Sequence, residues 1–449
     1  MPTPSRAVRR WLASAILAAA SAIPASAQPT EDPSSWPMAG RDARHTGAAE
    51  GPAPPYRRAW TARLEGQGLL AGPVVSAEVA VVVGRTSVVA LDPATGETRW
   101  EVEREEGAAG SPAIVGDLVI HASGQRDGAA LVGRRLDDGR EEWSTSTGAS
   151  VGSGIAVEGE RAYAATRAGE VLAVDVATGE VAWRFDTAGN LGTIPAVDEG
   201  RVFAVAQSQT FGPASLHAID AETGEEEWRF SLGQPVRSLG TSPAAGGGVV
   251  VAGLSDGRVH AVDADTGAER WAEDALPGWI RQPFGPGTVP AIPGSLAPGA
   301  AFVAGPSRAV RMEVGSGQVR WSYQLADLLT HLSASIAGRH LLLGDASGLA
   351  AAVDVGSGRL VWKAPLGSGP VGSVAVTEDR LLVIVAGERD SSVVALEHDP
   401  EGTLISETSP SVLNPAWAAL NYLGAAATVG VALWLLARGP EALRRRDRP

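Results

Sequence analysis

Short runs of alternating apolar and polar residues follow one another along most of the chain, separated by turns rich in Gly, Ser and Pro. Alternation with a period of two predicts half-buried β-strands. One unit has strands at 110–115 and 117–122, a third strand ending in an acidic residue, and a fourth carrying Trp143. Such units recur about every 40 residues, a period typical of repeat architectures.

The link between the third and fourth strands is the most regular part of the repeat. In its first copy, Asp92 is placed to accept hydrogen bonds from the turn backbone, and Gly96 supplies the positive φ of a bulged hairpin turn. We expect Trp100 to pack between neighbouring units. Another copy ends at Trp321, a shortened one ends at Trp143, and Trp60 is a further tryptophan of the series. The remaining copies place these residues at the three positions: Asp175, Gly179 and Trp183; Asp220, Gly224 and Trp228; Asp263, Gly267 and Trp271; Asp354, Gly358 and Trp362.

Four antiparallel strands per repeat predict an all-β, eight-bladed β-propeller of four-stranded antiparallel blades over residues 56–408. The eight repeat tryptophans are offset from the eight opening strands, because Trp60 precedes the first of them. We therefore expect Tyr56–Leu64 to close the ring as the outer strand of the last blade, with Thr403–Glu407 as the alternative. The opening strands are expected near Gly72, Gly110, Gly152, Gly192, Gly240, Gly287, Leu332 and Gly372.

Both ends of the chain have the pattern of export and membrane segments. A basic start, an apolar run and a small-x-small site make residues 1–27 a predicted signal peptide, with a first transmembrane helix as the alternative. Residues 28–55 are a predicted extended leader. After a linker at 409–415, the uncharged residues 416–437 would span about 33 Å as a helix, enough to cross a bilayer.

The basic tail at 438–449 sets the expected topology. By the positive-inside rule it stays in the cytoplasm, which makes the protein a single-pass protein of the cell membrane with its propeller outside the cytoplasm. The alternatives are a C-terminal amphipathic or core helix and a cleavable sorting signal.

Composition narrows the chemistry. The chain has no cysteine, which excludes disulfides, thiolate metal sites and a cysteine nucleophile. The formal net charge is −14, and residues 28–415 alone carry −20. A surface this acidic argues against nucleic acid or anionic lipid as the main partner.

Isolated histidines and acidic residues offer few candidate sites. His45 in the leader could be a ligand or a base, but a polar segment laid over the edge of the fold explains it better. His217 and His260 share one repeat position, which indicates packing. Asp263-Ala264-Asp265 copies only the start of a calcium loop, and His331 and His340 have no third ligand.

Two insertions break the repeat and are better candidates. Leu276–Gly299 stretches the interval between two repeat tryptophans to 50 residues, and Gln207–Ser215 lengthens the fourth unit. Insertions in repeat proteins map to loops, often on the binding face. Trp279, Arg281 and Phe284 are the candidate interaction residues, and the alternative is that the aromatic pair packs against the propeller itself.

The units Ala-Leu-Asp-x-x-Thr-Gly-Glu-x-x-Trp, with Gly-Ser-Pro-Ala openings and a Trp36-Pro37-Met38 leader, resemble the pyrroloquinoline quinone (PQQ)-like β-propeller repeat family. The resemblance covers about Trp36 to Glu407. It implies one of two functions: quinoprotein alcohol or glucose dehydrogenase, or a non-catalytic propeller that binds protein partners, such as the lipoprotein of the outer-membrane barrel assembly machine.

The enzymatic branch would need PQQ, Ca²⁺ bound by acidic and amide oxygens, an Asp base and, in many members, a ring of two adjacent cysteines. This chain has no cysteine, no haem domain and only three asparagines: Asn190, Asn414 and Asn421. We therefore expect no cofactor and no catalysis. The predicted function is a membrane-anchored, extracytoplasmic binding or scaffold module for an envelope protein or surface ligand. The alternative is a PQQ-dependent dehydrogenase that oxidises alcohols or sugars.

Overall fold

The computed structural model describes residues 35–404 except 69, 108–109, 126–127, 209–211, 236–241, 255–256, 276–294, 298, 306–307, 325–334 and 388. The chain divides into two units, Met1–Asp32 and Pro33–Pro449, and all described residues belong to the second. In these ranges no helix is long and apolar enough to cross a membrane. The signal peptide predicted at 1–27, the linker at 409–415, the span at 416–437 and the tail at 438–449 lie outside them.

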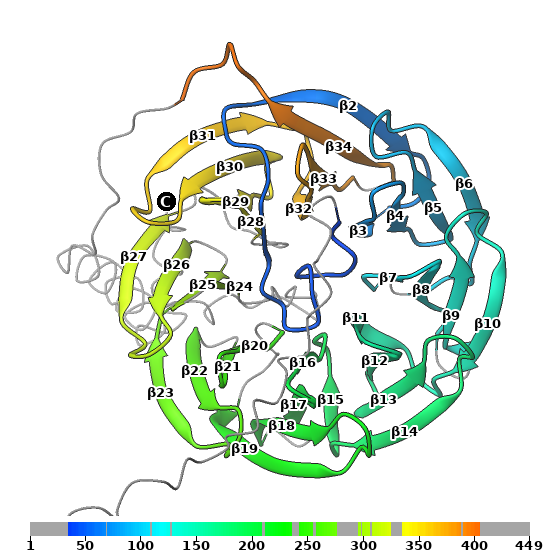
Figure 1. The fold of residues 1–449 in the computed structure, drawn as a ribbon, viewed down its shortest axis with the longest axis vertical. Coiled ribbons are helices and arrows are strands. Elements are labelled where there is room, and N and C mark those ends of the chain that lie inside the picture. Colours follow the sequence, from blue (N-terminus) through cyan, green and yellow to red (C-terminus); the bar gives the residue numbers. More distant parts are fainter. Residues whose placement is uncertain are drawn as a thin grey trace, which may run out of the picture. The chain divides into compact units, whose positions relative to one another are not determined.

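The strands form eight sheets, each built on a path of four antiparallel strands, which confirms the predicted eight-bladed propeller (Figure 1). Blade 1 comprises β3 (Ala71–Val75), β4 (Ala80–Val83), β5 (Ser87–Leu91) and β6 (Thr98–Glu103). Blade 2 comprises β7 (Ala113–Val115), β8 (Leu118–Ser123), β9 (Ala130–Arg135) and β10 (Glu141–Ser146). Blade 3 comprises β11 (Val151–Glu158), β12 (Arg161–Thr166), β13 (Glu170–Asp175) and β14 (Val181–Asp186). Blade 4 comprises β15 (Gly189–Leu191), β16 (Ala196–Asp198), β17 (Arg201–Ser208), β18 (Pro213–Asp220) and β19 (Glu226–Pro235).

The remaining blades follow the same order from the axis outward. Blade 5 comprises β20 (Ala244–Gly246), β21 (Val249–Gly253), β22 (Arg258–Asp263) and β23 (Glu269–Asp274). Blade 6 comprises β24 (Ser295–Ala297), β25 (Ala300–Gly305), β26 (Arg308–Glu313) and β27 (Val319–Gln324). Blade 7 comprises β28 (Ser335–Ala337), β29 (His340–Gly344), β30 (Leu349–Asp354) and β31 (Leu360–Pro365), with β1 (Ala48–Ala49) added in parallel to β28. Blade 8 comprises β32 (Val371–Val376), β33 (Leu381–Val385), β34 (Ser391–His398) and β2 (Tyr56–Leu64).

The last blade combines strands from both ends of the propeller. β2 pairs antiparallel with β34 from Tyr56↔His398 to Leu64↔Ser391 (Figure 1). Thr403 and Leu404 are in no strand, and 405–407 lie outside the described ranges. Of the two closures considered from the sequence, the structure therefore has the one through Tyr56–Leu64. Closure in this way pairs the edge that β34 would otherwise expose.

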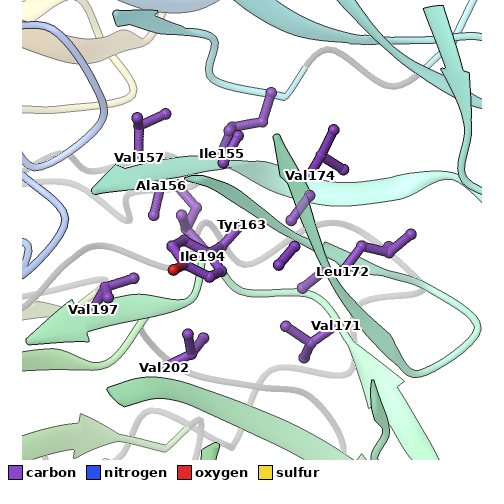
Figure 2. Packing of buried hydrophobic residues seen from close by; sticks show 14 of the residues in the cluster. Ile155, Ala156, Val157, Tyr163, Val171, Leu172, Val174, Ile194, Val197 and Val202 are labelled. Carbon is purple, nitrogen blue, oxygen red and sulfur yellow. The ribbon is translucent and has the colours of Figure 1, made fainter. Parts of the chain in front are cut away.

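Strand position within a blade decides the hydrophobic pattern. All five residues of β5 are buried, because neighbouring blades cover both faces of the inner three strands. In β6, at the perimeter, only Trp100 is buried. Figure 2 shows the packing between blades 3 and 4, where Val171 of β13 and Val202 of β17 belong to one buried cluster. β6 thus supplies one large side chain to the core and leaves most of its other residues to solvent.

The two insertions change their blades in different ways. In blade 4, β17 and β18 are eight residues long, and the short strand β15 pairs with the extended end of β17. In blade 6 the inner strand is Ser295–Ala297, so the opening strand expected near Gly287 is not the one that pairs with β25. Both positions lie within the insertion Leu276–Gly299, where the repeat pattern is interrupted. Gly287 itself lies outside the described ranges.

Candidate functional site

The repeat hairpins are built by their own Asp, Thr and Gly. In the first copy the Asp92 carboxylate accepts hydrogen bonds from the backbone N–H groups of Ala94 and Thr95, at 2.8 and 3.0 Å. The Gly96 N–H donates to the Asp92 carbonyl at 2.8 Å, and its φ of 78° is in the region that favours glycine. Asp175, Asp220, Asp263 and Asp354 accept equivalent bonds in their turns.

These bonds fix the protonation state of the repeat carboxylates. The Arg99 side chain, together with the turn N–H groups, lowers the pKa of Asp92. A hydrogen bond from Arg270 lowers the pKa of Asp263 to about 2. A general base works best with a pKa near the operating pH. The repeat aspartates therefore stabilise turns and have pKa values too low for a general base at neutral pH. Asp265 lies in one of these turns but instead forms an ion pair with Arg201 of the preceding blade at 2.9 Å.

Each turn glycine lies under a tryptophan of the preceding blade. A Cβ added to Gly179 would lie 2.6 Å from the Trp143 ring, and the Trp143 Nε1–H donates to the Val176 carbonyl at 2.9 Å. The same pairing joins Trp60 to Gly96, Trp100 to Gly139, Trp143 to Gly179, Trp183 to Gly224, Trp228 to Gly267, Trp271 to Gly317 and Trp321 to Gly358. Each of these indoles also donates to a carbonyl of the next blade. The tryptophans therefore form the seams of the ring.

The eighth seam differs because blade 8 has no covalent hairpin between its last two strands. Trp362 meets the ring of Tyr56 edge-on, with centroids 5.0 Å apart and an interplanar angle of 82°. The Tyr56 hydroxyl donates to the Pro52 carbonyl at 3.1 Å. An aromatic side chain at the start of β2 thus takes the place of the turn glycine.

The leader crosses the inner ends of the blades. The Val75 N–H of blade 1 donates to the Trp36 carbonyl at 2.8 Å, and the Ile114 N–H of blade 2 donates to the Pro37 carbonyl at 2.7 Å. Further on, Ala43, Arg44 and Gly47 accept bonds from the inner strands of blades 4, 5 and 7. Inner strands are sheet edges, so the leader satisfies backbone donors that would otherwise be unpaired.

A turn centred on Asp42 holds the middle of the leader. The Asp42 carboxylate accepts bonds from the Arg44 and Thr46 N–H groups at 3.0 and 3.1 Å, and from the Thr46 hydroxyl. Arg41 and His45 have φ angles of 73° and 60°, which are unusual for residues with a Cβ. The leader turn is therefore held in shape by side-chain bonds as well as by packing.

His45 is wholly buried by this turn. Its Nδ1–H donates to the Pro243 carbonyl at 2.7 Å, and its Nε2 has no partner in the described structure. Burial lowers the pKa of the imidazole, so it is neutral at physiological pH. With no exposed surface, it can join the leader to blade 5 but cannot meet a substrate in this conformation. This agrees with the interpretation of the leader as a segment laid over the fold.

Three other histidines, His121, His217 and His260, pack within or between blades. The Nδ1 atoms of His217 and His260 lie 2.7 and 2.9 Å from Glu226 and Glu269, two residues before the blade's tryptophan. In both, a phenylalanine of the preceding blade meets the imidazole edge-on, at 5.9 and 6.0 Å. Burial lowers the pKa of His121 to about 3, and its Nε2 accepts a bond from Arg134 at 3.0 Å.

Two carboxyl groups, those of Glu158 and Asp198, have raised pKa values, unlike the repeat aspartates. Burial, and then the charge of Asp198, raises the pKa of Glu158, while Arg44 of the leader opposes the change. Burial likewise raises the pKa of Asp198. Glu158 ends β11 and Asp198 ends β16, the inner strands of successive blades. No motif in the sequence marks this shared position. In the described residues no three His, Asp or Glu side chains are grouped to hold a metal ion.

The predicted interaction residues Trp279, Arg281 and Phe284 lie outside the described ranges, as does His331. His340 is half-buried, and burial lowers its pKa. Within the described surface, Leu404 is the only exposed large hydrophobic side chain, at 56%. The part of the propeller that the structure describes therefore has a largely polar surface.

Comparison with known proteins agrees with this architecture. The BamB from Moraxella catarrhalis has a crystal structure with a TM-score of 0.57, at 17% identity over 78% of this chain and 99% of that chain. A quinohemoprotein alcohol dehydrogenase from Pseudomonas putida HK5 has a TM-score of 0.68, at 15% identity over 84% of this chain and 82% of that chain. No curated protein matches the sequence significantly. At these identities the solved structures show the fold alone.

The repeat geometry and these neighbours define a PQQ-like β-propeller repeat protein. The family model described as outer membrane protein assembly factor BamB matches residues 56–135, 130–278 and 296–419. These stretches cover most of the chain, which therefore belongs to that family.

Proposed function

We propose that the protein is a non-catalytic, membrane-anchored propeller that binds or scaffolds another envelope protein outside the cytoplasm. The observation that carries this proposal is the match to the BamB family along almost the whole ring, since that family is described as an assembly factor. Propellers present rigid faces with variable loops, which suits a binding role. The proposed topology has a signal peptide at 1–27, a span at 416–437 and a cytoplasmic tail.

The geometry of the ring supports a structural use of its conspicuous side chains. The repeat aspartates make turns, the glycines and tryptophans make seams, and the buried imidazoles bond to neighbouring strands. The proposal includes no resident cofactor. Under the alternative, PQQ with Ca²⁺ would have to be held largely by residues other than these.

Contact with the partner is proposed to involve Trp279, Arg281 and Phe284. The test is crosslinking in intact cells with the full chain, followed by comparison of the double variant Trp279→Ala/Phe284→Ala with wild type. We expect one envelope protein to crosslink reproducibly and to be lost in the variant. The matched control is Ser144→Ala on β10, an exposed strand residue, which should leave that crosslink unchanged. A crosslink pattern identical in all three proteins would contradict the assignment of these residues.

A separate assay decides between the scaffold and the enzyme. The purified full chain is incubated with PQQ and Ca²⁺ and tested for dye-linked oxidation of alcohols and sugars. No turnover is expected. Sustained turnover that depends on added PQQ would overturn the non-catalytic proposal.

A further inference from the structure

The outer strands of the propeller divide into two groups by charge. In blades 1 to 5, the strands β6, β10, β14, β19 and β23 carry ten acidic and four basic residues. In blades 6 to 8, the strands β27, β31 and β2 carry five basic residues and no acidic one. These strands are neighbours along the perimeter (Figure 1). We name the five residues the basic rim: Arg57, Arg58, Arg63, Arg320 and Lys363.

All five side chains of the basic rim are exposed. Arg57 and Arg320 are partly neutralised, since Arg57 pairs with Glu397 at 2.8 Å and Arg320 pairs with Glu313 at 2.8 Å. Arg58 donates to the Leu366 carbonyl, a neutral acceptor, at 2.8 Å. For Arg63 the described structure contains no ion pair. The rim therefore keeps net positive charge at its surface.

The chain leaves the described propeller next to this rim. β34 ends at His398, opposite Tyr56 of β2, and the Asp399 N–H donates to the Pro55 carbonyl at 2.8 Å. The last described residue is Leu404, and the proposed span begins at Ala416. The intervening residues can reach at most about 40 Å when fully extended. If the span crosses a bilayer, the rim starts within reach of that bilayer's surface.

We propose that the basic rim faces and contacts an anionic lipid surface, so that the tethered propeller is held edge-on with its acidic outer strands turned away. The inference rests on the membrane span of the proposed function. The tether keeps the propeller at a high local concentration near the bilayer. Because the bilayer attracts the basic rim and repels the acidic outer strands, the uneven charge orients the ring. Basic residues near an anionic bilayer are attracted over about one Debye length, so contact is needed for the effect.

The division of charge on the outer strands also changes the interpretation of the net charge, which argued against anionic lipid as a partner. A net charge of −20 between residues 28 and 415 argues against binding to anionic lipid by a freely diffusing protein. For a tethered one, the distribution of charge decides the orientation. An acidic protein, or the acidic outer strands of a second copy, could also meet the rim, and the experiment separates these partners from lipid.

The absence of cysteine makes single-site labelling clean. The full-length protein is prepared as Thr61→Cys, next to Trp60 on β2, and as Ser144→Cys, at the equivalent position next to Trp143 on β10. Both positions are exposed. Each protein is labelled with a fluorophore and reconstituted into vesicles of phosphatidylcholine alone or with phosphatidylglycerol, and quenching by a headgroup-attached quencher is measured.

The charge variants are matched in the size of the charge change. Arg63→Glu/Lys363→Glu removes charge from the rim. Arg184→Glu/Arg229→Glu makes an equal change of net charge at exposed arginines of β14 and β19, and these, like Lys363, directly follow the blade's tryptophan. Circular dichroism melts check that both variants stay folded.

Quenching of the Thr61→Cys label is expected to rise about twofold when phosphatidylglycerol is added, and to fall back at high salt. The rise should vanish in the rim variant and persist in the control variant, while the Ser144→Cys label should show no rise. Equal quenching in both lipids, or loss of the rise in both charge variants, overturns the proposal. The proposal is also overturned if copies crosslink to one another through the rim and no lipid-dependent rise is seen. It is likewise overturned if an added acidic protein relieves the quenching. Failure to float with pure phosphatidylcholine vesicles would instead overturn the membrane span, and the inference with it.

Discussion

Seven turn glycines each support a tryptophan of the preceding blade, and two properties of glycine are used at once. The positive φ makes the turn, and the missing Cβ leaves room for the indole. The repeat motif in the sequence showed the first property, because Asp-x-x-Thr-Gly is a turn signature. It could not show the second, because the indole comes from the strand of another repeat.

The variant Gly179→Ala tests the two properties separately. Its Cβ would lie 2.6 Å from Trp143, so we expect a loss of about 2 to 4 kcal/mol in the free energy of unfolding. Gly159→Ala is the matched control in the same blade: φ is 59° and nothing lies within 4 Å of its Cβ. That control should cost only about 1 kcal/mol. Equal losses in denaturant titrations would show that the seam contact adds nothing to the backbone strain.

At the scale of elements, the closing strand and the leader both come from the N-terminal side of the propeller. β2 completes blade 8, and the leader touches the inner strands before it. The offset between the counts of tryptophans and opening strands predicted the closure through Tyr56–Leu64. The leader's path was not predictable, because its bonds are made by backbone groups that carry no side-chain signal.

Deletion of Tyr56–Leu64 should open the ring. β34 would become an exposed edge, and the buried side chains of Tyr56 and Leu64 would be lost. We expect the melting temperature to fall by about 5 to 10 °C and concentration-dependent oligomers to appear on gel filtration. A monomeric protein with an unchanged melt would rule out a structural role for the closure.

The leader turn depends on Asp42, which accepts bonds from Arg44 and Thr46. Asp42→Ala should remove about 1 to 2 kcal/mol of local stability. Hydrogen exchange of residues 40–47 is expected to accelerate while exchange in the outer strands stays the same. A replacement at the nearby exposed Glu50, Glu50→Ala, is the control. Acceleration spread evenly over all blades would indicate global destabilisation instead.

At the scale of the whole molecule, buried imidazoles make the ring sensitive to acid. His45, His121 and His217 lie in the leader, blade 2 and blade 4, and burial lowers the pKa of each. The unfolded chain takes up protons near pH 6.5, whereas the folded chain does not. Stability is therefore complete above about pH 6.5 and falls as the pH drops towards the folded pKa values.

His121 gives the clearest test, because its folded pKa is about 3. Between pH 7 and pH 5, protonation of His121 in the unfolded chain alone should lower the free energy of unfolding by about 2 kcal/mol. His121→Gln removes this titration, so the loss of stability over that range should shrink by about this amount in denaturant titrations. Ser144→Ala, at an exposed position on β10 of the same blade, is the control and should leave the pH dependence as it is. The same pH profile in wild type and His121→Gln would contradict the assignment.

The sequence by itself determined the architecture: repeat period, turn chemistry and strand alternation are local properties that recur eight times, so each copy supports the others. It also predicted which end would close the ring. Only the tertiary structure decided how Trp and Gly of different repeats meet, how the leader crosses the blades, and that blades 6 to 8 bring the basic outer strands together. Those features depend on residues far apart in sequence, because a closed ring makes neighbours of its two ends.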